Sequence, residues 1–185
     1  MRRLPLVLLA LPLFTAGCAD DFCGDDLAPL LEVGDGTHGF LSIDDGAVLQ
    51  VERGSQGGQH IWAGLVASGL HPGSEDISEG LRNDDLPWIR FELESVEGVH
   101  SNENLQRRPL DRYDDGSFGL ETRQVPFRHW PVLPDDWAEQ DIGDREAFME
   151  SMDFVLRATV EDACDDTVTD EVTVRLAFPP REETG

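Results

Sequence analysis

The side chains that most often carry out chemistry in proteins are dispersed along this chain. Zinc sites typically draw on close pairs of histidine or cysteine ligands, whereas the five histidines here stand singly. Nucleophilic catalysis has no support either, because the chain holds neither a Gly-x-Ser-x-Gly elbow nor a cysteine–histidine signature. The sequence therefore predicts a protein that is not an enzyme and that uses no cofactor. The histidines are His38, His60, His71, His100 and His129.

Sulfur-based copper sites are also disfavoured. A blue-copper site needs a cysteine with a histidine close behind it, and no histidine follows Cys164. Met149 and Met152 could offer thioethers to Cu(I). Their spacing with Phe148 is more typical of the packed face of a short helix.

Two acidic segments could bind calcium. The first runs from Asp111 to Ser117, but its third position is Tyr113 and its twelfth is Thr122, where a bidentate Glu belongs. Its Asp114-Asp115-Gly116-Ser117 sequence favours a hairpin turn. The second segment is the acidic tip of a C-terminal hairpin, whose carboxylates are weak candidates for a metal site: Asp162, Asp165, Asp166 and Asp170.

The most distinctive segment of the chain runs from Gly54 to Trp62 and reads Gly-Ser-Gln-Gly-Gly-Gln-His-Ile-Trp. It resembles a Gln-Gly-Gly-x-His element of uncharacterised secreted bacterial lipoproteins, a resemblance that implies no activity. Paired glycines permit positive φ and hence a sharp turn between two strands. His60 is then either a ligand for a metal or small molecule, or a hydrogen-bonding group that pins the turn while Trp62 packs in the core. We favour the structural interpretation. The candidate turn or ligand residues are Gln56, Gly57, Gly58 and His60.

The segment from Phe127 to Trp137 holds two tryptophans and two prolines. A rigid aromatic loop of this kind can anchor a protein or carbohydrate partner. The alternative is a long connection that folds its tryptophans over an open end of the domain. Trp130 and Trp137 are the candidate partner-binding residues.

The N-terminus has the layout of a secretory signal. Arg2 and Arg3 precede an apolar run, residues 4–14, which is too short to span a bilayer. The following Thr-Ala-Gly-Cys, residues 15–18, resembles the cleavage site of bacterial lipoprotein signals, although these usually have Leu where Thr15 stands. The resemblance implies removal of residues 1–17 and acylation of Cys18, and Ala19 favours the outer membrane. The predicted location is therefore the outer membrane or the periplasm, with the protein held by its lipid anchor. A soluble secreted protein is the alternative.

Two further cysteines remain if Cys18 is acylated. In an oxidising compartment, Cys23 and Cys164 are expected to form one disulfide. Such a bond closes a long loop and contributes about 4–5 kcal/mol in the chain-entropy model. Two free thiols are the alternative.

The chain is strongly acidic, with 14 basic and 38 acidic residues and a net charge of −24. Loss of Arg2 and Arg3 with the signal would make this −26. Nucleic-acid binding is excluded, because it requires a basic face. The excess of acidic residues is expected to keep an exposed surface soluble. The alternative interpretation is weak binding of divalent cations.

Apolar and polar residues alternate in several short segments, which predicts β-strands with one buried face. The clearest are residues 88–96, 118–128 (in two parts), 154–160 and 172–178, with earlier runs at 48–53 and 60–70. Residues 144–153 are the only predicted helix. These elements indicate an all-β, two-sheet antiparallel sandwich with one short helix in a long loop. The C-terminal hairpin resembles the last two strands of immunoglobulin-like domains.

The predicted organisation is a signal peptide (1–17), a lipidated acidic tether (18–29), a sandwich domain (30–180) and a disordered tail (181–185). The predicted core lies between the two sheets, with loops left as the binding surfaces. Its members are Ile89, Phe91, Leu93, Leu156, Val160, Val172, Val174 and Leu176.

Overall fold

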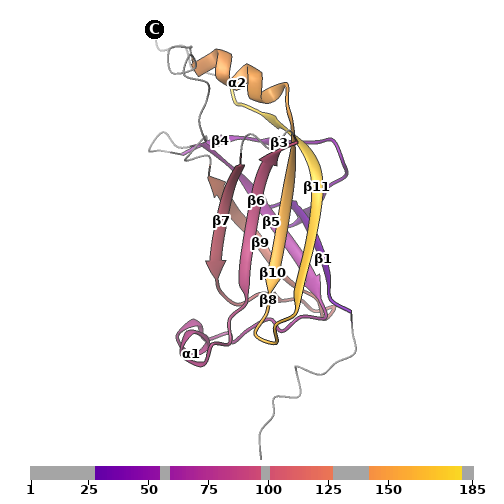
Figure 1. The fold of residues 1–185 in the computed structure, drawn as a ribbon, viewed down its shortest axis with the longest axis vertical. Coiled ribbons are helices and arrows are strands. Elements are labelled where there is room, and N and C mark those ends of the chain that lie inside the picture. The colour runs from indigo at the N-terminus through magenta and orange to yellow at the C-terminus, as the bar shows by residue number, and fades with distance from the viewer. Residues whose placement is uncertain (1–27, 55–58, 97–100, 127–141, 181–185) are drawn as a thin grey trace, which may run out of the picture.

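The computed structural model describes residues 28–54, 59–96, 101–126 and 142–180, which form two facing β-sheets and two helices (Figure 1). The first sheet has the order β2-β1-β5-β9-β8, with β4 also paired to β5. Its strands are β1 (Leu30–Asp35), β2 (Leu41–Ser42), β4 (Glu52–Arg53), β5 (Gln59–Ser68), β8 (Asp111–Arg112) and β9 (Phe118–Pro126).

The second sheet has the order β3-β11-β10-β6-β7. All its neighbours are antiparallel except β3 and β11, which run parallel. Its strands are β3 (Ala47–Gln50), β6 (Trp88–Ser95), β7 (Ser101–Arg107), β10 (Asp153–Glu161) and β11 (Thr167–Ala177).

The strand order is that of an immunoglobulin-like sandwich. In that fold one sheet has the order A-B-E-D and the other contains G-F-C. In this protein the positions of A, B, E and D are taken by β1, β5, β9 and β8, and those of G, F and C by β11, β10 and β6. Strand β7 is added beside β6. The predicted fold class, an all-β sandwich of two sheets, is therefore confirmed.

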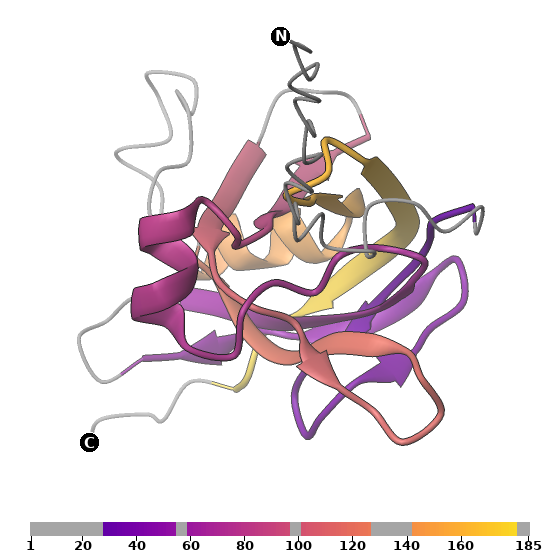
Figure 2. The same ribbon diagram turned by 90° about the horizontal axis from the view of Figure 1, so that it is seen from below.

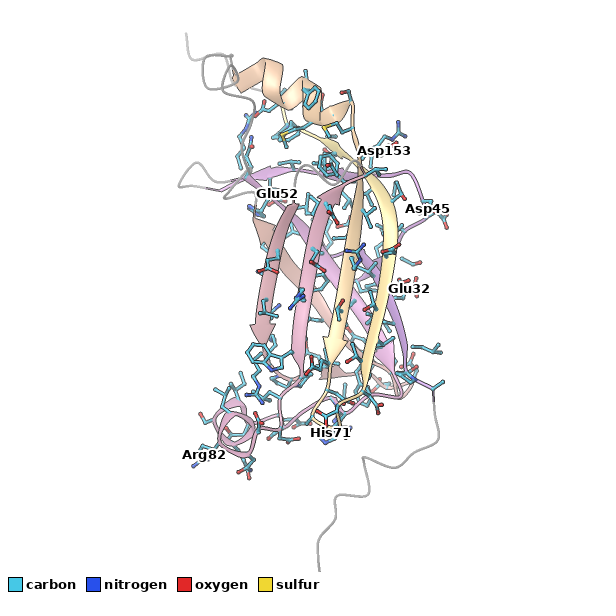
Figure 3. The ribbon with its side chains drawn as sticks, viewed as in Figure 1. Glu32, Asp45, Glu52, His71, Arg82 and Asp153 are labelled. Carbon is cyan, nitrogen blue, oxygen red and sulfur yellow. The ribbon has the colours of Figure 1, made fainter. Side chains whose placement is uncertain are left out.

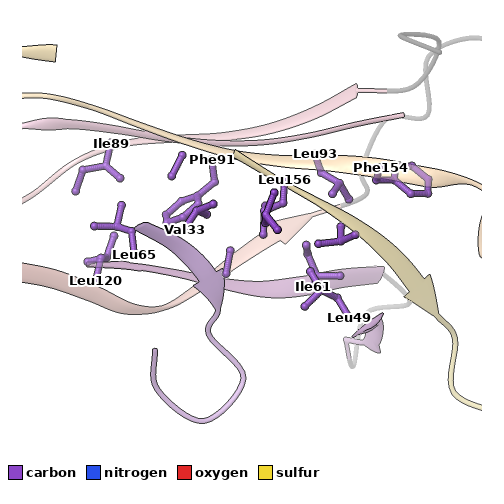
Figure 4. Packing of buried hydrophobic residues seen from close by; sticks show 14 of the residues in the cluster. Val33, Leu49, Ile61, Leu65, Ile89, Phe91, Leu93, Leu120, Phe154 and Leu156 are labelled. Carbon is purple, nitrogen blue, oxygen red and sulfur yellow. The ribbon is translucent and has the colours of Figure 1, made fainter. Parts of the chain in front are cut away.

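The core fills the space between the sheets (Figure 4). All eight residues predicted to line it are buried, because each lies on the inward side of a strand with period-two alternation. Ile61, Ala63 and Leu65 of β5 pack against them from the opposite sheet.

The run at residues 48–53, predicted as one strand, divides between the two sheets. β3 pairs with β11 of the second sheet, whereas β4 pairs with β5 of the first. Val51 lies between them, buried, and its N–H donates to the carbonyl of Ala177. The chain thus crosses from one sheet to the other without losing its alternation.

The sandwich has two ends with different features. The tip end carries the turn between β10 and β11, residues 162–166, and lies at the bottom of Figure 1. The opposite α2 end carries helix α2 (Ile142–Glu150). The acidic tip is shorter than predicted, because β11 begins at Thr167 and Asp170 is therefore a strand residue.

The helix count was predicted wrongly. Helix α2 begins two residues earlier than expected and ends at Glu150, so Asp153 starts β10 instead. Met149 is buried in the core as expected, but Phe148 is exposed. A second helix, α1 (Ile77–Asn83), occupies a segment predicted as a polar loop. The sequence carried its signal: Asp76 accepts hydrogen bonds from the N–H groups of Ser78 and Glu79, an N-cap arrangement.

Candidate functional site

A charge cluster around the buried carboxylate of Glu146 ties α2 to the sandwich at the α2 end. The Glu146 carboxylate is buried, and both of its oxygens lie 3.1 Å from Arg53 Nη2. Gln59 donates a 2.7 Å hydrogen bond to the same carboxylate, and Arg53 also donates to the carbonyl of Pro179. This cluster therefore joins β4, β5, α2 and the segment that follows β11.

His60 lies beside this cluster on the outer face of the first sheet. Its neighbour Ile61 points into the core, so the alternation of β5 sends His60 and Trp62 outward. Trp62 is half-buried and contacts the His60 ring edge-on, with the ring centroids 5.1 Å apart. The expectation that Trp62 packs in the core is therefore wrong.

The His60 side chain is only 10% exposed, yet its Nε2 has no hydrogen-bond partner among the described residues. The nearest carboxylate oxygen is Glu52 Oε2, 3.8 Å away on the paired strand β4. The turn that His60 is predicted to pin, residues 55–58, lies outside the described residues, so that role stays a prediction. An imidazole nitrogen that faces a carboxylate can contribute to a site for a borderline metal ion. A second such pair lies at the tip end, where His71 Nδ1 is 3.3 Å from Asp85 Oδ1, but that nitrogen already accepts a hydrogen bond from Gly73 N–H.

The other residues of this element, Gln56, Gly57 and Gly58, lie outside the described residues, as do Trp130 and Trp137. Their predicted roles stay predictions. Across the described ranges, no group of three or more His, Cys, Asp and Glu side chains is placed to hold a metal ion.

At the tip end, Asp162 acts as a hydrogen-bond acceptor for the backbone. Its Oδ2 accepts from His71 N–H at 2.7 Å, and its Oδ1 accepts from the N–H groups of Cys164 and Asp166 at 2.9 and 3.0 Å. Three backbone donors occupy a carboxylate that is only 6% exposed. These contacts favour a structural role for Asp162: it closes the turn and ties it to the chain leaving β5.

The remaining acidic candidates do not converge on Asp162. Asp165 has a left-handed backbone, with φ of 65°, and both it and Asp166 are exposed. Asp170 points inward and accepts a 2.9 Å hydrogen bond from Val33 N–H across the sandwich. It therefore links β11 to β1, which belong to different sheets.

Cys164 is half-buried in the tip turn. Its expected partner Cys23, and the acylation candidate Cys18, lie outside the described residues. The first described strand, β1, starts at this same end, because Leu30 pairs with Ser68 at the end of β5.

The turn at Asp114–Ser117 has the geometry expected of a hairpin. Gly116 has φ of 87°, and Tyr113 N–H donates to the carbonyl of Ser117. The Asp115 carboxylate accepts from the hydroxyl and the N–H of Ser117, which lowers the pKa of Asp115 below its ordinary value.

The structural roles of two acidic residues were not predicted. Glu146 looked like an ordinary member of an acidic chain and Asp170 was a candidate metal ligand, and the partners of both are far away in the sequence. Only Asp170 carried a signal, since it occupies the inward phase of β11 together with Val172 and Val174.

No protein-family model, curated protein or solved structure matches this chain. None of the helices in the described ranges is long and apolar enough to cross a membrane.

Proposed function

We propose that this protein is a lipid-anchored component of a bacterial cell envelope whose sandwich is a non-catalytic binding or structural module. The observation that carries the proposal is the N-terminal layout: two arginines, an apolar run, and Ala16-Gly17 directly before Cys18. Two or more acyl chains on Cys18 would hold the protein on a membrane almost permanently, since each buried methylene contributes about 0.8 kcal/mol.

The architecture supports a module that acts through its surface. The interior is occupied by large side chains, with Phe91, Phe154 and Ile61 among those fully buried. A core filled in this way leaves loops and strand edges for recognition. The negative charge disfavours nucleic acid, so a protein or carbohydrate is the expected partner class.

Membrane fractionation tests the anchor. We expect the wild-type protein to stay with membranes after alkaline extraction and Cys18→Ser to be lost from them. Cys23→Ser is the matched control, because it removes a neighbouring thiol and should leave the protein on the membrane. Equal membrane retention of the wild type and Cys18→Ser would refute the proposal.

The partner surface is proposed to be the loop from Phe127 to Trp137. If Trp130 and Trp137 serve binding, replacing both with Ala leaves the melting temperature within about 2 °C of wild type and abolishes partner capture. A loss of several degrees would assign the tryptophans to the structure of the domain instead.

Metal binding is a second candidate, favoured by the unpartnered Nε2 of His60 beside Glu52. Two protein ligands would leave the other coordination positions to water. Metal analysis after dialysis against Zn²⁺ or Cu²⁺ tests it. One bound equivalent that His60→Ala abolishes and His38→Ala retains would support the site, and no bound metal would eliminate it.

A further inference from the structure

Helix α1 is fixed to the sandwich and turns two apolar side chains to solvent. Gly80 is buried against Leu86, in a space too small for a Cβ. Asp85 N–H donates to the Gly80 carbonyl at the C-terminal end of the helix. Ile77 and Leu81 are one turn apart, so they share a face, and they are 48% and 52% exposed.

The helix lies at the tip end, where the N-terminal segment joins the sandwich. Leu30 opens β1 next to Ser68, and the chain that follows Ser68 is bonded through His71 to Asp162 of the tip. Arg82 of α1 and His71 mark this end in Figure 3, and Figure 2 shows the same end from below. The ten residues from Cys18 to the first described residue, at position 28, reach at most about 35 Å.

We propose that Ile77 and Leu81 contact the surface of a bilayer with zwitterionic headgroups, so that α1 docks the tip end against the membrane. This inference rests on the proposed acylation of Cys18. The chain enters the sandwich at the tip end, where β1 starts, so the tether joins the proposed anchor to the end that carries α1.

Four exposed acidic residues lie on or beside the helix, and three arginines lie near them: Arg82 on the helix, Arg107 paired with Asp84, and Arg112 paired with Glu75. The four acidic residues are Glu75, Asp76, Glu79 and Asp84. The local charge is therefore only slightly negative, and the repulsion from an anionic lipid surface comes mainly from the net charge of −24 of the whole chain. Two apolar side chains bind lipid weakly on their own. The tether raises their effective concentration at the surface to the millimolar range, where weak contacts become populated.

Hydroxyl-radical footprinting of the acylated full-length mature protein in phosphatidylcholine vesicles tests the proposal. The reference is the Cys18→Ser protein mixed with the same vesicles. Leu41, 61% exposed and on the strand that pairs with the far end of β1, is a matched internal control for Leu81. We expect the labelling rate of Leu81 to fall at least threefold in the anchored protein while that of Leu41 changes by less than 1.5-fold.

A vesicle with one third phosphatidylglycerol at low salt should restore most of the Leu81 labelling. Substitution Leu81→Glu should restore the labelling of Ile77, whereas Leu41→Glu should not.

Unchanged Leu81 labelling in a protein whose acyl mass is verified would overturn the docking and leave the anchor standing. Protection that follows protein density rather than lipid composition would assign the face to a second copy and overturn the proposal. A missing acyl mass would refute both the anchor and the docking.

Discussion

At the tip end, the carboxylate of Asp162 closes the turn between β10 and β11 by accepting backbone hydrogen bonds. It is buried and accepts three backbone N–H groups, from His71, Cys164 and Asp166. Replacing it with Asn puts an amide donor against backbone donors. We expect Asp162→Asn to lower the free energy of unfolding by about 2–3 kcal/mol, measured by urea denaturation. Asp166→Asn, an exposed change in the same turn, should stay within about 0.5 kcal/mol of wild type. Equal effects would contradict the role given to Asp162.

Asp115 illustrates the same chemistry at the surface. Hydrogen bonds from the Ser117 hydroxyl and then from its N–H lower the pKa of Asp115 in the folded protein. A folded pKa below the unfolded one means that the group stabilises the fold above its unfolded pKa and loses this contribution as the pH falls. NMR titration should show the pKa of Asp115 rising toward its ordinary value in Ser117→Ala. No rise would show that the hydroxyl is not the main cause.

At the scale of elements, α2 is held by charge as well as by packing. Glu146 is buried between Arg53 and Gln59, so neutralising it leaves a partly buried arginine without its counter-ion. Glu146→Gln should lower the free energy of unfolding by about 2–3 kcal/mol, less than for a fully buried pair because Arg53 stays partly exposed. Glu103→Gln removes an exposed ion pair with Arg90 and should cost under about 0.5 kcal/mol. Thermal unfolding followed by circular dichroism measures both variants. Equal losses of unfolding free energy would show that the buried Glu146 contributes no more than an exposed ion pair.

Strands with two neighbours and one buried face were predictable from the sequence. β6, β10 and β11 alternate strictly, because their inward residues meet the opposite sheet. β7 was missed, since its Ser-Asn-Glu-Asn-Leu-Gln-Arg sequence is polar and, among the described strands, it pairs with β6 only, as an edge strand. β1 was missed for a different reason. Its Gly34 lies close to the backbone of Leu41, and a contact of this kind leaves no alternation of apolar and polar residues in the sequence.

The candidate sites were less predictable than the strands. His60 was singled out by its glycine-rich neighbours, yet its pairing with Glu52 depends on the register of β4 and β5. The contact between Asp170 and Val33 joins residues 137 positions apart. Periodicity places a side chain on a face, but the partner on another strand is fixed only when the sheets pack.

For the whole molecule, the proposed anchor and the proposed disulfide meet at the tip end. β1 starts there and Cys164 lies in the turn. The five residues from Cys23 to the start of the described chain reach at most about 18 Å. The bond would hold the tether against the sandwich and keep the tip end toward the membrane, which is the orientation that α1 docking requires.

One measurement tests the central claim of acylation at Cys18 most directly: mass spectrometry of the membrane-extracted protein after trypsin digestion without reduction. The arginine positions place Cys18 and Cys23 in one peptide, 18–53, and Cys164 in another, 158–175. We predict a single species that contains both peptides plus the mass of the acyl chains, and that separates on reduction. An unmodified N-terminus at Cys18, or a peptide that begins at Leu4, would contradict the account.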